Sequence, residues 1–292
     1  MSDWKLVQGD CLEVMLGMAD DSVDLVFTSP PYEAARTYGI NFTLKGEEWV
    51  WWAYERFVQC LRVCKGLVCW VVDGQTRNFR WSGTPHLLAA DLIRAGYWAR
   101  RDCVYHRVGI PGSGGPDYFR GDTEFVLVFQ RVSGKLPWSE NTACGEPCKW
   151  GVGGAMSNRT SDGQRRNAKT GTRLKKLHTK REPNGKMRQQ QYEPPELANP
   201  GNVIHCKVGG GRMGSDLAHE TEAPFPESLV KRFVLSFCPP GGTVLDPFCG
   251  SGTTGAICRQ TRRQFMGIDI RESQIVLSER RIRQNLQEPL FT

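Results

Sequence analysis

The stretch GTVLDPFCGSGTTGAICRQTRRQFMGID, residues 242–269, decides the fold. Residues 242–246 form a short apolar run that predicts a buried strand, and PFCGSG follows as a loop. The apolar spacing of residues 253–262 then predicts a helix, and residues 265–269 predict a second strand. A strand, a glycine loop, a helix and a further strand form the repeating unit of a doubly wound α/β sheet, which binds nucleotide-type cofactors at the carboxyl ends of its strands.

The same alternation of strands and helices extends through most of the chain. Helical spacing of apolar residues is clearest at residues 47–65. One buried stripe is predicted there, formed by Trp49, Trp52, Ala53, Phe57, Cys60, Leu61 and Cys64. Further strands are predicted at 4–8, 23–28, 67–72, 99–106 and 123–132, order returns at 202–206, and helices are predicted at 12–18, 84–95 and 226–237. This order indicates an α/β protein with a largely parallel sheet.

Residues 133–200 interrupt the pattern. This segment has no apolar periodicity and is rich in Gly, Pro, Asn and basic residues. Residues 149–190 hold six Lys and six Arg against two acids, a net +10, whereas the whole chain carries +7, so the remainder is net −3. Such a block is either a solvated loop or a surface for a polyanion. We therefore expect three parts: catalytic residues 1–132, a basic insertion at 133–200, and cofactor-binding residues 201–292.

Length and composition narrow the class of protein. The 292 residues suffice for one large α/β domain with an insertion. No apolar run approaches the roughly 20 residues that span a bilayer, and MSDWKLVQGD at residues 1–10 lacks the features of a secretory signal. Many of the eleven cysteines lie within apolar runs, so we expect reduced core thiols. These features predict a cytoplasmic protein without a membrane partner.

The charge of the glycine loop indicates its ligand. Asp246 begins the loop and no G-K-[ST] lysine is present, so a pyrophosphate would be repelled. Asp269 lies 19 residues beyond Gly250, the spacing at which an acid reaches a ribose hydroxyl. S-adenosyl-L-methionine fits these demands, because it carries a ribose, an ammonium and a sulfonium but no phosphate.

A second motif, SPPY at residues 29–32, ends the strand predicted at 23–28. The two prolines remove backbone donors and leave rigid carbonyl acceptors beside the Ser29 hydroxyl and the Tyr32 ring. Hydrogen bonds from a nucleobase amine to the Ser29 hydroxyl and the Pro30 carbonyl would free the nitrogen lone pair for attack on a methyl sulfonium. Stacking on Tyr32 would hold a base that is rotated out of its duplex. Taken alone, the motif is also compatible with a polyproline turn.

Together, TSPPY, LDPFCGSGTT and GIDI resemble the motifs of amino-methylating DNA methyltransferases, which act on N4 of cytosine or N6 of adenine. TSPPY precedes the cofactor loop, with the basic insertion between them, and this order resembles the permuted group called beta. The similarity covers residues 5–132 and 202–285. It implies a Rossmann-like S-adenosylmethionine-dependent fold, with a mostly parallel seven-stranded sheet, helices on both faces and an irregular basic insertion.

The resemblance assigns roles to individual residues. Ser29, Pro30, Pro31 and Tyr32 would form the catalytic base-amine site. Asp269 would meet the ribose and Asp10 the adenine end of the cofactor. HETEAPFP at 219–226 resembles the segment beside the methionine end, although two extra residues separate His219 from Ala223. The full expected cofactor set is Asp10, Thr28, Phe225, Pro226, Asp246, Pro247, Phe248, Gly250, Ser251, Gly252, Thr253 and Asp269.

The resemblance also implies double-stranded DNA as substrate and the insertion as the target-recognition part. The expected DNA contacts are Arg165, Arg166, Lys175, Lys176, Lys180 and Arg181. The chain is too short to hold a nuclease as well, so a restriction endonuclease partner would be a separate protein. A bacterial or phage-encoded enzyme acting at the nucleoid is expected, and a homodimer is left open.

Members with Ser in the first motif position mostly resemble cytosine-N4 enzymes, which favours cytosine over adenine N6 as the target. A catalytically decayed DNA-binding module is a further alternative. Methylation of RNA or of a glutamine amide is disfavoured, because those relatives usually carry Asn-Pro-Pro-Tyr. Cytosine-C5 chemistry would need Cys148 as nucleophile, outside any predicted strand end. Zinc binding by Cys144, Cys148, His205 and Cys206 has only a weak spacing signal, and no metal is expected.

Overall fold

The computed structural model describes residues 3–34, 41–110, 114–147, 165–166, 173–174, 178–181, 187–190, 197–208, 216–220 and 224–284. It divides into two compact units, residues 1–143 with 201–292 and residues 144–200. The segment expected as an insertion, 133–200, encloses the second unit. The first unit holds both motifs.

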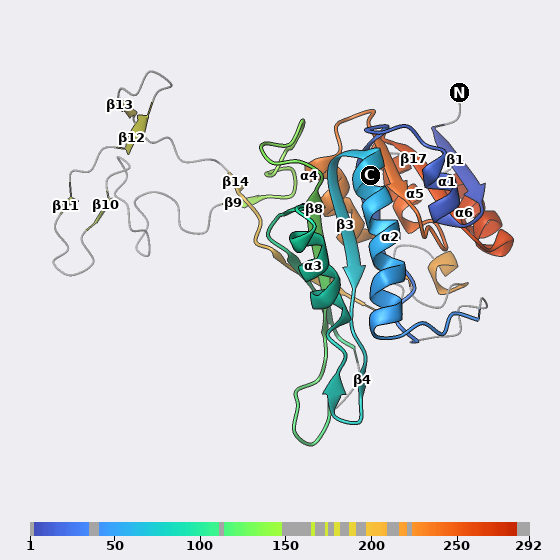
Figure 1. Ribbon diagram of the computed structural model, residues 1–292. Helices are drawn as coiled ribbons and strands as arrows, with labels where there is room; N and C mark the ends of the chain where they lie inside the picture. Colours follow the sequence, from blue (N-terminus) through green and yellow to red (C-terminus); the bar gives the residue numbers. More distant parts are fainter. Residues whose placement is uncertain are drawn as a thin grey trace. The chain divides into compact units, whose positions relative to one another are not determined.

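A single mixed sheet organises the first unit (Figure 1). Its strands lie in the order β1-β17-β16-β2-β3-β8-β7-β15, and the short β6 pairs with β8. Their bounds are β1 Trp4–Gln8, β2 Val23–Thr28, β3 Cys64–Val72, β6 Trp98–Ala99, β7 Cys103–Val108, β8 Thr123–Gln130, β15 Val203–Lys207, β16 Thr243–Asp246 and β17 Gln264–Asp269.

The sheet has nine strands in the part of the chain that the structure describes, rather than the seven expected. Most neighbours are parallel, as predicted, and β8 runs antiparallel to β3, β7 and β6. One extra strand arises because the strand predicted at 99–106 is split into β6 and β7. Between them the Asp102 side chain accepts a hydrogen bond from the Val128 amide at 3.1 Å, which replaces a ladder bond. The other is β15, which pairs parallel with β7 at the edge of the sheet.

Helices cover both faces of this sheet, as expected. Alternate residues of β3 point to opposite faces, so that Val68 and Trp70 pack in one core cluster while Cys69 and Val71 pack in the other. The first cluster is closed by α1 Cys11–Leu16, α2 Glu47–Val63 and α3 Thr84–Arg94, and the second by α4 Glu227–Phe237, α5 Thr253–Gln260 and α6 Glu272–Gln284.

Buried cysteines contribute to both clusters. All ten cysteines that the structure describes are free, and eight of them are buried, which agrees with the prediction of reduced core thiols. None of the helices in the described ranges is both long and apolar enough to cross a bilayer.

The glycine loop is shaped by a close approach of α6. Gly252 has φ +78°, and a Cβ there would lie 2.9 Å from the Ser278 backbone. Gly250 also has a positive φ of +47°, and its carbonyl accepts a hydrogen bond from Ser278 Oγ at 2.6 Å. A side chain at position 252 would therefore push the loop away from α6.

The 3₁₀ helix η1, Asp216–Glu220, also belongs to the first unit.

The second unit holds short strand pairs in its described residues. In the second unit, β9 Glu146–Pro147 pairs with β14 Leu197–Ala198, β10 Arg165–Arg166 with β11 Arg173–Leu174, and β12 His178–Arg181 with β13 Met187–Gln190.

Candidate active site

The two motifs meet at the carboxyl ends of adjacent parallel strands. β2 ends at Thr28, directly before SPPY, and pairs with β16, which ends at Asp246. Thr28 Oγ1 donates a hydrogen bond of 2.5 Å to Asp246 Oδ1, across 218 positions of sequence. Parallel strands place their carboxyl ends at one edge of the sheet, so the two loops that follow these strands lie together there.

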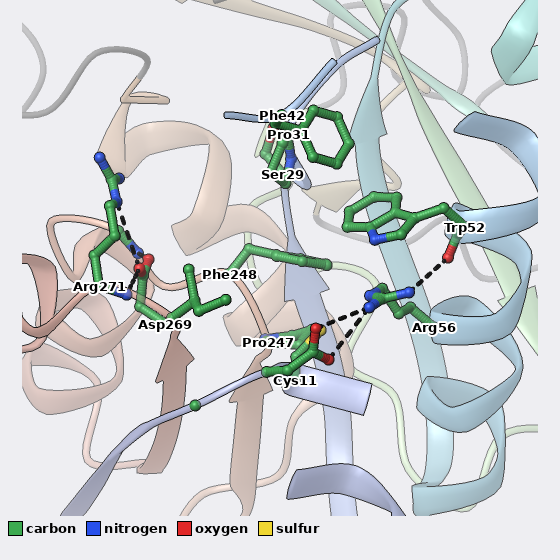
Figure 2. Close-up of a pocket in the computed structure, with 14 residues that line it drawn as sticks. Cys11, Ser29, Pro31, Phe42, Trp52, Arg56, Pro247, Phe248, Asp269 and Arg271 are labelled. Atoms are coloured by element: carbon green, nitrogen blue, oxygen red, sulfur yellow. Dashed lines mark hydrogen bonds and ion pairs between the residues drawn. The ribbon is translucent and has the colours of Figure 1, made fainter. Parts of the chain in front are cut away.

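A cavity of about 240 Å³ opens between these loops and α2. Figure 2 shows Trp52 and Arg56 of α2 on one side, Asp269 and Arg271 on the other, and the Phe248 ring between them. Ser29 and Pro31 of the SPPY corner line the same cavity. The complete lining is Gly9, Asp10, Cys11, Ser29, Pro31, Phe42, Trp52, Arg56, Pro247, Phe248, Gly250, Asp269, Ile270 and Arg271.

Asp246 holds the glycine loop in place through buried hydrogen bonds. Its side chain is buried, and its oxygens accept hydrogen bonds from Thr28, from Thr254 Oγ1 at 2.6 Å and from the Phe248 amide at 3.1 Å. Burial raises the pKa of this carboxyl to about 6, against the lowering effect of the three donors. Asp246 does not line the cavity, so its predicted contact with the cofactor stays a prediction.

Asp269 closes β17 and faces the cavity. Its Oδ2 accepts a hydrogen bond from the Gly250 amide at 3.0 Å and its Oδ1 one from the Arg271 amide at 2.9 Å. Burial raises its pKa above the ordinary value, while the amide and guanidinium of Arg271 oppose the shift. An acid held at a strand end in this way could accept hydrogen bonds from ribose hydroxyls.

The SPPY corner is held from several sides. The Pro31 carbonyl accepts a hydrogen bond of 2.8 Å from Trp49 Nε1 of α2. The next residue after the motif, Glu33, is buried and accepts hydrogen bonds from the amides of Gly46 and Gln75 at 2.9 and 3.0 Å. Tyr32 donates its hydroxyl to Glu124 at 2.7 Å. These contacts hold the SPPY corner in place.

Two cavity residues on α2 were missed from the sequence. Trp52 packs against Phe248, with ring centroids 5.7 Å apart, and the Arg56 guanidinium lies 4.5 Å above the Trp52 ring. Arg56 also pairs with Asp10 at 2.9 Å. Residues 52 and 56 are one helical turn apart, so they share a face of α2. An arginine within an otherwise apolar helical stripe was the available signal.

The predicted cofactor set is divided by the structure. Five of its members line the cavity: Asp10, Pro247, Phe248, Gly250 and Asp269. Five others are not among the lining residues and belong to the glycine loop or to the ends of the elements beside it: Thr28, Asp246, Ser251, Gly252 and Thr253. Of these, Ser251 and Thr253 accept hydrogen bonds from the buried Arg281. Phe225 packs edge-on against Phe27, at 5.6 Å, and neither it nor Pro226 is among the lining residues.

Other predicted residues lie partly outside the described residues. Three residues are outside the described ranges altogether: Lys175, Lys176 and Cys148. For five more the backbone is described, as part of η1, β10 or β12, but the side chain is not: His219, Arg165, Arg166, Lys180 and Arg181. Within the described ranges no group of three or more His, Cys, Asp or Glu side chains is arranged to hold a metal ion.

The cavity suits the cofactor that the sequence predicted. It offers a carboxylate at one end, aromatic walls at Phe248 and Trp52, and the loop backbone at Gly250. Arg56 Nε, buried beside it, has no hydrogen-bond partner among the described residues, so a bound molecule could supply an acceptor. Adenine, ribose and a methionine chain could all find partners in this lining.

Comparison with curated proteins gives relatives of nearly full length. The chain is 24% identical to "DNA adenine methyltransferase YhdJ" of Escherichia coli (strain K12) over 278 residues, which cover 95% of this chain and 82% of that protein. It is 23% identical to "Type II methyltransferase M.HinfI" of Haemophilus influenzae over 300 residues, 97% of this chain and 69% of that protein.

Solved structures of the same fold include the PvuII DNA methyltransferase (cytosine-N4-specific), with a TM-score of 0.65, 17% identity and coverage of 96% of this chain and 86% of that one. A "Putative DNA Modification Methylase" of Thermus thermophilus, complexed with S-adenosyl-L-methionine, matches with a TM-score of 0.59 and 18% identity over 97% and 94% of the two chains.

A family model described as DNA methylase, N6/N4 methyltransferase, matches residues 23–280. This range contains the SPPY corner, the basic segment and the glycine loop. The chain therefore belongs to the N6/N4 family of DNA methyltransferases, whose methyl donor is S-adenosyl-L-methionine.

Proposed function

We propose that the protein methylates the exocyclic N4 amine of cytosine at a specific site in double-stranded DNA, by direct attack of that amine on the methyl group of S-adenosyl-L-methionine. The observation that carries the proposal is that Ser29 and Pro31 line the same cavity as Gly250 and Asp269. Direct transfer requires the amine site and the methyl donor site to share one space.

In this proposal, the SPPY corner binds the amine. The Ser29 hydroxyl and the Pro30 carbonyl accept its two hydrogens, which favours a pyramidal nitrogen with a free lone pair. Tyr32 stacks on the base, which must leave the duplex because its amine cannot be reached within the stack. The contacts of Pro31 and Glu33 keep the corner in place, so little reorganisation is needed during the reaction.

The glycine loop and its neighbours bind the cofactor. Asp269 accepts the ribose hydroxyls, and Asp10, fixed by Arg56, lies at the adenine end. Phe248 and Trp52 enclose the flat part of the molecule, and Gly250 allows the backbone to approach it closely. Bound there, the cofactor supplies an electrophilic methyl group. Asp246 and Thr28 serve by holding the loop against the catalytic strand.

Adenine N6 is the second candidate. The relative that is named a DNA adenine methyltransferase is 24% identical to this chain over nearly its whole length, which favours that base. Ser29 favours cytosine instead, because family members with Ser in this motif position mostly resemble cytosine-N4 enzymes. The chemistry of the amine is the same in both cases, so the choice depends on which base fits beside Tyr32.

We further propose that the basic segment at residues 149–190 contacts DNA phosphates and reads base edges. Its net charge of +10 contrasts with −3 for the rest of the chain. A relative is named a type II methyltransferase. A cognate endonuclease encoded as a separate protein is consistent with that name.

The test is to incubate the protein with S-adenosyl-L-methionine labelled in its methyl group and with unmethylated genomic DNA, and then to digest the DNA to nucleosides. We expect the label in N4-methylcytosine. Label in N6-methyladenine would overturn the choice of base, and label in neither would overturn DNA amine methylation. Ser29→Ala serves as the matched control, because it keeps the cofactor loop intact.

A further inference from the structure

A chain of hydrogen bonds leads away from the amine site. Ser29 Oγ donates to the Tyr32 hydroxyl at 3.4 Å, and that hydroxyl donates to Glu124 Oε2 at 2.7 Å. Both donors point in the same direction, from the catalytic corner toward the carboxylate. Ser29 and Tyr32 belong to the predicted motif, but Glu124 carries no motif signal and lies 92 positions from Tyr32.

The topology explains why Glu124 is there. β8 is antiparallel to β3, and Val72 at the carboxyl end of β3 pairs with Phe125 near the start of β8. The amino end of β8 therefore reaches the edge of the sheet that carries the active site. Glu124 is the second residue of that strand, so its position is fixed by the sheet rather than by a loop.

The surroundings of Glu124 hold it in place. Its side chain is 12% exposed, and Arg107 Nη1 of the neighbouring β7 pairs with Oε1 at 3.0 Å. Arg107 is itself fixed by a bond of 3.1 Å to the Gly121 carbonyl. Among the described residues, Asp73, which follows β3, and Tyr105 of β7 also interact electrostatically with Glu124. The Tyr32 hydroxyl thus bonds to Oε2 while Arg107 pairs with Oε1.

The proposed reaction needs such a group. When an amine nitrogen gains a methyl group it becomes positively charged, and it must lose a proton to give the neutral methylated base. A serine or tyrosine hydroxyl can pass a proton on, but it cannot keep an extra one near neutral pH. A carboxylate can accept it.

We propose that Glu124 is the terminal proton acceptor of methyl transfer, reached through Ser29 and Tyr32. The nitrogen lone pair forms the new N–C bond while the S–C bond of the donor breaks and its electron pair stays on sulfur. One amine proton then moves to Ser29 Oγ, the Ser29 hydroxyl proton moves to Tyr32, and the Tyr32 proton moves to Glu124 Oε2. Ser29 and Tyr32 end unchanged, and the Glu124 carboxylate becomes a carboxylic acid that later returns its proton to water.

This inference rests on the proposed amine methylation but holds for either base, since cytosine N4 and adenine N6 release the same proton. It makes Glu124 a residue that acts through Tyr32, without contact with the substrate. A purely orienting role would need the hydrogen bond alone, whereas a relay needs a group that can be protonated. Glutamine separates the two, because its amide oxygen accepts the bond from Tyr32 but cannot take the proton. Its amide nitrogen then stands in place of Oε1, and the ion pair with Arg107 is lost.

The experiment measures single-turnover transfer of labelled methyl groups to unmethylated genomic DNA, with protein in excess, for the wild type, Glu124→Gln, Tyr32→Phe and the double variant. Glu279→Gln is the matched control, since Glu279 pairs with Arg283 on the exposed side of α6. We expect Glu124→Gln to transfer about 100-fold more slowly with unchanged cofactor affinity. Tyr32→Phe should lose a similar factor, and the double variant should be no slower than the slower single variant.

The pH dependence of the transfer rate gives a second test of the relay. The wild-type rate should fall at acid pH as Glu124 becomes protonated, and this fall should be absent in Glu124→Gln and retained in Asp73→Asn. Two outcomes would overturn the relay and leave the proposed function standing. One is a transfer rate of Glu124→Gln equal to that of the wild type, and the other is losses of rate that multiply in the double variant. No transfer to a DNA amine by the wild type would overturn both.

Discussion

Thr28 Oγ1 donates a 2.5 Å hydrogen bond to Asp246 Oδ1, and this one contact joins the strand that presents SPPY to the strand that presents the glycine loop. Both residues are buried. The two halves of the candidate active site are therefore connected through the core of the sheet, not only across the cavity.

Asp246 makes folding stability depend on pH. The fold raises the pKa of this carboxyl from 3.8 to about 6, so the folded state binds the proton more tightly than the unfolded state. The resulting stability is fully present below pH 3.8 and is lost as pH rises through about 6, a loss on the order of 3 kcal/mol. Asp246→Asn should abolish this part of the dependence. Urea unfolding of both proteins between about pH 4 and 7 measures it, and parallel curves would contradict the assignment.

Substitutions in the two motifs should separate catalysis from cofactor binding. We expect Ser29→Ala to lower the rate of transfer about 100-fold or more and to leave the dissociation constant of S-adenosyl-L-methionine within about twofold. Asp269→Ala should weaken cofactor binding about tenfold or more, because the ribose loses a charged acceptor. Isothermal titration with the cofactor and single-turnover transfer give the two quantities. The reverse pattern would exchange the roles of the two motifs.

Trp52 offers a test of the cavity wall that uses its neighbour as a control. Trp52→Ala removes the ring that packs on Phe248 and carries Arg56, so cofactor affinity should fall about tenfold. Trp51→Ala removes an equally large ring that is 62% exposed and does not line the cavity, and affinity should not change. If the two substitutions weaken cofactor binding equally, Trp52 has no specific contact with the cofactor, and α2 contributes only to the stability of the fold.

The basic segment should make DNA affinity depend strongly on salt. If about six phosphates are neutralised, the log–log slope of affinity against salt concentration is near −5. Replacing both Lys180 and Arg181 by Ala should reduce the slope by about two and weaken binding to all sequences alike. Replacing Arg283, which lies on α6, should leave the slope unchanged. Fluorescence anisotropy at several salt concentrations measures this, and a nearly flat wild-type response would exclude the segment as the phosphate contact.

Local patterns predicted the elements that build the catalytic edge. The strands at 4–8 and 23–28 have the predicted bounds, and the helices at 47–65 and 84–95 differ only by a residue or two at their carboxyl ends. These elements have strong apolar periods and clear breakers. The helix Glu272–Gln284 was not predicted, because most of its residues are polar and it is held by buried contacts of Ser278 and Arg281.

Tertiary pairing accounts for the site residues that the sequence did not reveal. Glu124 reaches Tyr32 only because β8 runs antiparallel beside β3. Arg56 reaches Asp10 only because α2 packs against α1, whose N-cap is Asp10. Asp246 illustrates the opposite case. Its position at a strand end was predicted from the motif, but its buried hydrogen bonds depend on Thr28 and Thr254, which the motif alone does not place.

A crystal structure of the protein with S-adenosyl-L-methionine is the most direct measurement of whether the SPPY corner and the glycine loop form one site. We expect the ribose hydroxyls on the Asp269 carboxylate, the adenine toward Asp10, and the methyl carbon directed at the space beside the Ser29 hydroxyl. A cofactor bound outside this cavity, or bound within it with its methyl group turned away from Ser29, would contradict the proposed site.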